Sequence, residues 1–143
     1  MKKDKNNLIE PELSYKLMGI CFNVYNILGA KYQEKYYQRA VEVELKKEKI
    51  SYQKEMPYKL EYKGESIGRY FFDFLIENKV ILELKTVPSI SKKDIGQLLR
   101  YLKESNLKLG IIVNFGKEKV EYKRTINNSR LIGENIREEL VNK

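Results

Sequence analysis

The sequence predicts an α/β fold in which helices flank a mixed β-sheet. Three observations predict it. Apolar residues first recur at helical spacing, they then alternate with a period of two through the middle of the chain, and a helical segment separates the third strand from a fourth. A helical crossover lets two strands lie parallel, whereas strands joined by short turns pair antiparallel. Helices must then pack on the faces of that sheet.

Two helices are expected to open the chain after a polar start. Residues 12–28 carry apolar side chains at helical spacing, and Gly29 is placed to end that helix. A second helix is expected at residues 33–49. We expect residues 1–10 to form a flexible N-terminus and residues 11–143 to form a single domain, because no repeat or linker divides the sequence.

The middle of the chain alternates with the period of a β-strand and is divided by turn residues. Pro88 ends this region, and Ser91 can cap a helix that follows it. The short apolar run at residues 109–114 fits a buried strand, residues 120–125 fit an edge strand, and residues 130–141 fit a last helix. The first three strands are expected at residues 52–62, 66–76 and 80–85, joined by turns at residues 63–65 and 77–79.

Charged residues interrupt two neighbouring apolar strands. Asp73 lies in Phe-Phe-Asp-Phe-Leu, and Glu83 and Lys85 lie in Val-Ile-Leu-Glu-Leu-Lys. Buried charges are costly unless they are paired or bind a metal, and converging carboxylates can hold a divalent cation. Lys85 shares the strand face of Glu83 and can stabilise negative charge there. The sequence therefore predicts a site for phosphodiester hydrolysis; the alternative is a purely structural ion cluster neutralised by Lys85.

The apolar pattern also predicts the register of these two strands. A three-residue loop at residues 77–79 pairs Ile76 with Val80 and places Asp73 opposite Glu83, whereas a two-residue loop would mix polar and apolar faces. Paired residues share a face of the sheet. The predicted apolar face is formed by Phe72, Phe74, Ile76, Val80, Leu82 and Leu84.

Composition excludes several kinds of chemistry. The chain has no histidine, which excludes Ser-His-Asp and Cys-His systems and zinc sites built from histidine. Its single cysteine excludes an internal disulfide framework. The formal net charge of +8 favours a polyanionic partner, although it could also reflect a lysine-rich proteome. No apolar run suits a membrane span and the first residues lack a secretory signal, so no membrane partner and a cytoplasmic location are expected.

The charged strand residues resemble the Asp…Glu-x-Lys core of the PD-(D/E)XK nuclease superfamily. Gln97 and Tyr101 resemble the Gln-x-x-x-Tyr motif of its RecB-like members. Glu34 and Tyr37 resemble the Glu-x-x-Tyr of the small bacterial GxxExxY proteins, which are grouped in this superfamily. The similarity covers roughly residues 13–125. It departs from the motifs at Lys31, where the GxxExxY signature has glycine, and at Phe72, where the superfamily name has proline.

The resemblance implies a restriction-endonuclease-like core and a role for each matching residue. Asp73, Glu83, Glu34 and the backbone carbonyl of Leu84 would bind Mg²⁺ or Mn²⁺. Lys85 would orient the attacking water or stabilise the phosphorane charge. Gln97 and Tyr101 would position the substrate or Lys85.

The function expected from these residues is that of a metal-dependent nuclease that hydrolyses phosphodiester bonds in nucleic acid. DNA is favoured over RNA, and sequence specificity should be low because backbone contacts by basic residues carry no sequence information. The alternative is a non-catalytic nucleic-acid-binding module or a subunit of a larger nucleic-acid-processing or defence assembly. A third alternative is an oligomeric or protein-interaction scaffold, and a homodimer or larger complex is compatible with each.

Overall fold

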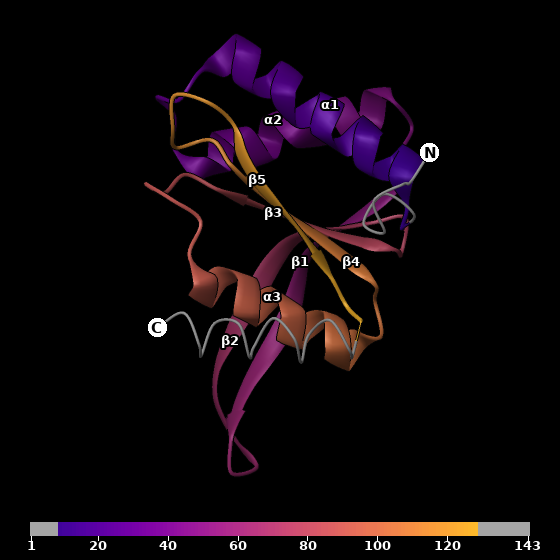
Figure 1. Ribbon diagram of the computed structural model, residues 1–143, viewed down its shortest axis with the longest axis vertical. Helices are drawn as coiled ribbons and strands as arrows, with labels where there is room; N and C mark the ends of the chain where they lie inside the picture. Colours follow the sequence, from indigo (N-terminus) through magenta and orange to yellow (C-terminus); the bar gives the residue numbers. More distant parts are fainter. Residues whose placement is uncertain (1–8, 129–143) are drawn as a thin grey trace, which may run out of the picture.

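The computed structural model describes residues 9–128, which form one mixed five-stranded sheet with the strand order β1-β2-β3-β4-β5 (Figure 1). Every predicted helix and strand within this range is present, with ends that differ by at most two residues. The predicted helix at residues 130–141 lies outside the described residues, as does most of the segment at residues 1–10. The elements are α1 Pro11–Leu28, α2 Glu34–Lys47, β1 Tyr52–Tyr62, β2 Glu65–Ile76, β3 Val80–Lys85, α3 Lys92–Ser105, β4 Leu109–Asn114 and β5 Glu121–Ile126.

The sheet lies between two helical layers. α1 and α2 cover one face, where their buried side chains contact Phe74, Leu82 and Leu84. α3 covers the opposite face and contacts Ile81 and Ile112. The same helix connects β3 to β4, which pair parallel, whereas all other neighbouring strands pair antiparallel. The prediction of a mixed sheet with flanking helices is confirmed.

The turn between β2 and β3 has the predicted three-residue form. Ile76 pairs with Val80, and the Lys79 amide donates to the Ile76 carbonyl at 2.9 Å. Glu77 and Asn78 adopt φ angles of 50° and 57°, in the left-handed region that a tight turn requires. The register that directs Asp73 toward Glu83 is therefore set here.

The side chains of β2 change faces at Asp73. Phe72 packs in the cluster beneath α3, whereas Phe74 packs in the cluster beneath α1 and α2. Strict alternation would place both on one face, so the prediction that Phe72 belongs to the face of Phe74 is wrong. β1 shows the same irregularity. Lys54 pairs with Phe74 and Met56 pairs with Phe72, and Glu55 between them has a φ of 57°, in the left-handed region.

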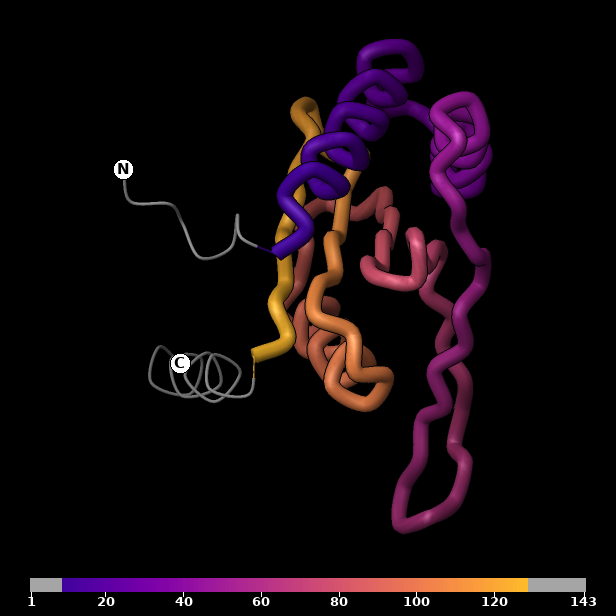
Figure 2. Tube along the Cα trace, turned by 90° about the vertical axis from the view of Figure 1, so that its right-hand side faces the viewer, coloured from indigo at the N-terminus to yellow at the C-terminus, as the bar shows by residue number. Residues whose placement is uncertain are grey.

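The β1–β2 hairpin extends well beyond the rest of the sheet (Figure 2). Its tip turns at Lys63 and Gly64, which have φ angles of 50° and 83°. Within this hairpin, β2 carries Tyr70 and Asp73 of the site described next. Within residues 9–128, no helix is long and apolar enough to cross a membrane.

Candidate functional site

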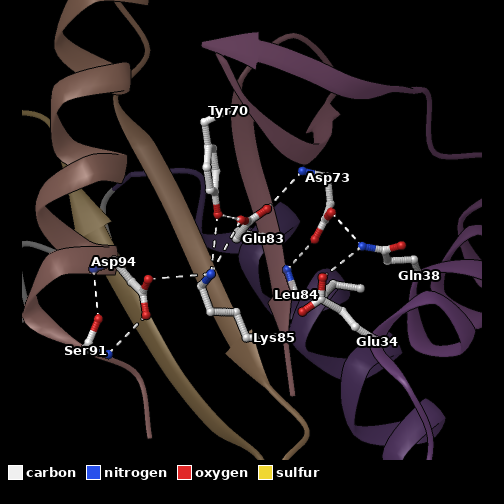
Figure 3. A network of polar contacts seen from close by, with 9 residues as sticks. All are labelled: Glu34, Gln38, Tyr70, Asp73, Glu83, Leu84, Lys85, Ser91 and Asp94. Carbon is white, nitrogen blue, oxygen red and sulfur yellow. Dashed lines mark hydrogen bonds and ion pairs between the residues drawn. The ribbon is translucent and has the colours of Figure 1, made fainter. Parts of the chain in front are cut away.

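The candidate site lies where β2 and β3 separate. Backbone pairing between them ends at Phe74 and Leu82. Beyond this point the carboxylates take over the role of the backbone: the Leu84 amide donates to Asp73 Oδ2 at 2.7 Å, and the Asp73 amide donates to Glu83 Oε1 at 2.9 Å (Figure 3). The two carboxylates therefore lie between the strands, each held by the backbone of the opposite one.

α2 contributes two further polar side chains. Glu34, the first residue of the helix, and Gln38 lie one turn apart and share a helix face. The Gln38 amide nitrogen donates to Asp73 Oδ1 at 2.7 Å and to Glu34 Oε2 at 3.3 Å. One amide group thus occupies the space between two carboxylates. The structure brings Glu34 to the site, as predicted, and adds Gln38, for which the only signal in the sequence was its spacing from Glu34.

Lys85 is held by groups on three sides. Its ammonium lies 3.8 Å from Glu83 Oε2, 3.6 Å from Asp94 Oδ1 and 3.3 Å from the Tyr70 hydroxyl (Figure 3). The Tyr70 hydroxyl in turn donates to Glu83 Oε2. Sequence reasoning missed both Tyr70 and Asp94, because neither belongs to the Asp…Glu-x-Lys pattern.

Asp94 reaches Lys85 from the N-terminus of α3. The Ser91 hydroxyl accepts from the Asp94 amide at 3.1 Å, and the Asp94 carboxylate accepts from the Ser91 amide at 3.2 Å, which forms a capping box. Burial opposes ionisation of Asp94, but hydrogen bonds from Ser91 and the charge of Lys85 outweigh it and lower its pKa. Asp94 is therefore a fixed negative charge beside Lys85.

The carboxylates of the site resist ionisation. Burial and then the charge of Glu83 raise the pKa of Asp73 to about 8. Burial also raises the pKa of Glu83, although hydrogen bonds from Tyr70 and the Asp73 amide oppose this. Burial, followed by the charge of Asp73, raises the pKa of Glu34. Lys85 alone therefore does not compensate the negative charge that these three residues would carry together.

Tyr70 remains a hydrogen-bond donor throughout the physiological pH range. Burial raises the pKa of its hydroxyl, and the negative charge of Glu83 raises it further. A permanently protonated hydroxyl can donate to Glu83 while its oxygen accepts from Lys85. Tyr70 thus fixes the spacing between these two charged groups.

Among residues 9–128, the two motif residues on α3 make no hydrogen bond with the carboxylates of the site. Tyr101 is buried and packs its ring 4.7 Å from that of Phe72 and 5.6 Å from that of Tyr58, measured between centroids. Gln97 is half-buried, and within residues 9–128 it makes no recorded hydrogen bond. Asp94, rather than Gln97 or Tyr101, is the α3 residue that contacts Lys85. The positioning roles of Gln97 and Tyr101 stay predictions.

The donor set suits a hard divalent cation. Asp73, Glu83 and Glu34 offer carboxylate oxygens from three elements. Burial raises the pKa of all three, and a neighbouring carboxylate raises it further at Asp73 and Glu34, so a bound cation would favour their ionised forms. Within the described part of the chain, no three acidic side chains are already arranged as metal ligands. Gln38 holds Asp73 and Glu34 instead, so a cation would replace its amide as their shared partner. The residues present therefore fit a metal once this hydrogen bond is exchanged.

Comparison with known proteins bears on what this arrangement means. A solved structure described as "Crystal structure of SSO0001" superimposes with a TM-score of 0.50 at 17% sequence identity, covering 97% of this chain and 71% of that one. Identity this low shows similarity of fold alone. A search of curated proteins found no match. The family model described as the PD-(D/E)XK nuclease superfamily matches residues 11–125, a range that contains the whole site. The chain therefore belongs to the PD-(D/E)XK nuclease superfamily.

Proposed function

We propose that this protein is a metal-dependent nuclease that hydrolyses phosphodiester bonds in nucleic acid, with DNA favoured over RNA and with low sequence specificity. One observation carries the proposal: Asp73, Glu83 and Lys85 meet at the point where β2 and β3 separate. There each carboxylate is fixed by a backbone amide of the opposite strand and the lysine is fixed by Tyr70 and Asp94. Preorganised charges of this kind supply much of the rate of phosphoryl transfer.

Asp73, Glu83 and Glu34, with the backbone carbonyl of Leu84, are the residues that would hold Mg²⁺ or Mn²⁺. Such a metal, when bound, polarises a phosphate and lowers the pKa of a coordinated water. Lys85 would donate hydrogen bonds to the negative charge that develops on the phosphate. Asp94 and Tyr70 act through Lys85, since they keep its ammonium beside Glu83.

We also infer that the chain belongs to the GxxExxY group of the superfamily. The departure at Lys31 is compatible with this, because the turn before α2 is supported in a different way. Tyr37 donates its hydroxyl to the carbonyl of Gly29, and Gly29 adopts a φ of 73°. Gly29 therefore supplies a positive-φ turn two positions before the place of the signature glycine, and Glu34 still reaches the site.

Cleavage assays with a matched set of variants test the nuclease proposal. The unmutated protein should cut DNA in the presence of Mg²⁺ or Mn²⁺ and should not cut it in EDTA. Glu83→Gln should abolish cleavage, and Lys85→Ala should lower it ~10²–10³-fold, the range for loss of one transition-state donor. Glu118→Gln alters an exposed carboxylate in the β4–β5 loop and should leave the rate unchanged. Absence of cleavage on single- and double-stranded DNA and RNA would contradict the proposal.

A binding module without catalysis is the second candidate. It is favoured by the fact that both oxygens of Asp73 and both oxygens of Glu83 already accept hydrogen bonds from the protein. In that case Lys85→Ala and Glu83→Gln would bind nucleic acid as tightly as the unmutated protein, and none of the three would cut it. The same assay, run beside a binding titration, therefore separates the two functions.

A further inference from the structure

A cavity of about 470 Å³ opens beside Asp73, between α2 and the β1–β2 hairpin. Gln38 and Asp73 are among its lining residues, so it adjoins the candidate site directly. Its volume lies within the range of pockets that bind small ligands or single groups of a larger one. The remaining lining residues identify the kind of group that it suits.

Phe71 presents an aromatic ring to this cavity. The residue is 49% exposed, although it precedes the buried Phe72 in the same strand. The reversal of faces at Asp73 explains its position: Phe71 and Phe74 both line the cavity, whereas Phe72 packs beneath α3. An exposed ring next to a site for phosphodiester chemistry is suited to stacking on a nucleobase, because every base has a π-face.

Two cations line the same cavity from α2. Lys35 and Arg39 are one helical turn apart, and within residues 9–128 neither forms a recorded ion pair. Lys35 Nζ lies 5.2 Å and Arg39 Cζ lies 5.7 Å from the centroid of the Tyr36 ring. Lys54, the other lining cation, is paired with Glu42 at 3.1 Å and is thereby neutralised. Lys35 and Arg39 are consequently the groups available to a phosphate.

We propose that this cavity binds one unpaired nucleotide next to the phosphate to be cut, with its base on Phe71 and its flanking phosphate between Lys35 and Arg39. The inference rests on the proposed function and specifies its substrate class as single-stranded nucleic acid or an unpaired end. A paired base in a duplex is stacked on both sides and cannot lie on an exposed ring unless it is first extruded. Glu55 carries negative charge on the β1 side of the cavity, so the phosphate lies toward α2.

Binding measured in EDTA, where no cleavage occurs, tests this proposal separately from catalysis. Fluorescence anisotropy would compare a labelled single-stranded DNA 12-mer with the corresponding duplex at low salt. Phe71→Ala should weaken single-strand binding about 5- to 150-fold, the range expected for loss of one base–aromatic stack, and should change duplex binding far less. Tyr122→Ala is the matched control, because Tyr122 is 50% exposed on β5, at the opposite edge of the sheet.

An abasic position moved along the 12-mer adds a second measurement. At one place along the 12-mer, the missing base should weaken binding to the unmutated protein. The same abasic 12-mer should bind Phe71→Ala no more weakly than the complete 12-mer does, since the stack is already lost. Phe71→Leu, which keeps an apolar side chain without a π-face, should behave like Phe71→Ala, whereas Phe71→Tyr should bind normally. These two conservative variants also decide the question if Phe71→Ala does not fold.

The proposal is overturned if Phe71→Leu binds single strands as well as Phe71→Tyr does, if single-strand and duplex affinity fall equally, or if single strands do not bind. Metal-dependent cleavage by the unmutated protein would still support the nuclease function in each of these cases. Conversely, Phe71-dependent binding of single strands by a protein that never cuts them would keep this inference and refute the nuclease. The two failures are therefore distinguishable.

Discussion

Tyr70 contacts a buried carboxylate, Glu83, and a partly buried ammonium, Lys85, through one hydroxyl. Tyr70→Phe leaves the ring in place but removes the donor to Glu83 and the acceptor for Lys85. Because a buried charged group without its partner is costly, the free energy of unfolding should fall by about 1–3 kcal/mol, measured by urea denaturation. Tyr101→Phe is the control, since the Tyr101 ring packs on Phe72 and its hydroxyl makes no hydrogen bond to any residue between 9 and 128. Equal effects of the two substitutions would contradict the role of Tyr70.

Asp73 makes the stability of the metal-free protein depend on pH in an unusual direction. Its pKa is raised from 3.8 to about 8, so between these values the native state holds a proton that the unfolded state releases. Stability should therefore fall as pH rises from about 4 to about 8, by at most ~1.4 kcal/mol per pH unit for one proton. Glu34 and Glu83, whose pKa values are also raised, act in the same direction.

Urea denaturation in EDTA at several pH values checks this expectation. Asp73→Asn should reduce the slope, since an amide does not titrate, whereas Glu118→Gln should keep it. The carboxylates with lowered pKa values, such as Glu121, lose their contribution only as pH falls through the acid range and do not disturb the window above pH 5. Rising stability between pH 5 and pH 8 would show that these carboxylates are compensated without a metal.

At the scale of elements, the N-terminus of α3 joins a helix cap to the site. Asp94→Asn keeps an oxygen that can accept from the Ser91 amide but removes the charge beside Lys85. We expect slower metal-dependent cleavage with little loss of stability. Ser91→Ala should do the reverse, lowering the free energy of unfolding by about 0.5–2 kcal/mol while preserving the cleavage rate of the folded protein. A normal rate in Asp94→Asn would exclude a positioning role.

The β2–β3 hairpin shows how far the sequence predicts this fold. The apolar pattern determined the three-residue turn and the pairing of Ile76 with Val80, because a slip by one residue would have exposed the apolar face. The reversal of faces at Asp73 was not predictable. It coincides with a left-handed conformation of Glu55 in the partner strand, and no glycine or asparagine marks that position in the sequence.

The site residues that belong to a sequence motif were predictable. The residues that join the site only through hydrogen bonds or an ion pair were not. Asp73, Glu83 and Lys85 come together because strand register follows from the hydrophobic pattern, whereas Glu34 was expected at the site only from the resemblance to the superfamily. Gln38, Tyr70 and Asp94 are single polar residues whose side chains meet the site only after the helices have packed. Their partners lie 35, 13 and 9 positions away, so local sequence gives no signal of the contact.

For the whole molecule, metal binding should appear as added stability. A cation that binds only the native state stabilises it by RT ln(1 + [L]/Kd), or about 1.4 kcal/mol at ten times its Kd. Mg²⁺ or Mn²⁺ should therefore raise the Tm measured by differential scanning fluorimetry, because it relieves repulsion among Asp73, Glu83 and Glu34. Glu83→Gln should abolish the shift and Glu118→Gln should retain it. No shift at millimolar metal would indicate a structural cluster.

The net charge of +8 predicts how the whole surface contributes to binding nucleic acid. Each phosphate neutralised on a single strand adds about 0.7 to the magnitude of the slope of log K against log[salt], because a condensed counterion is released. Titrations at several salt concentrations should therefore give a steep slope for the unmutated protein. The double substitution Lys35→Ala/Arg39→Ala should reduce the slope by about 0.7, because the two cations share one phosphate. Phe71→Ala should instead lower affinity by a similar factor at every salt concentration, since stacking releases no counterions. If Phe71→Ala changed the slope and the substitutions of Lys35 and Arg39 did not, the proposed places of the base and the phosphate in the cavity would have to be exchanged.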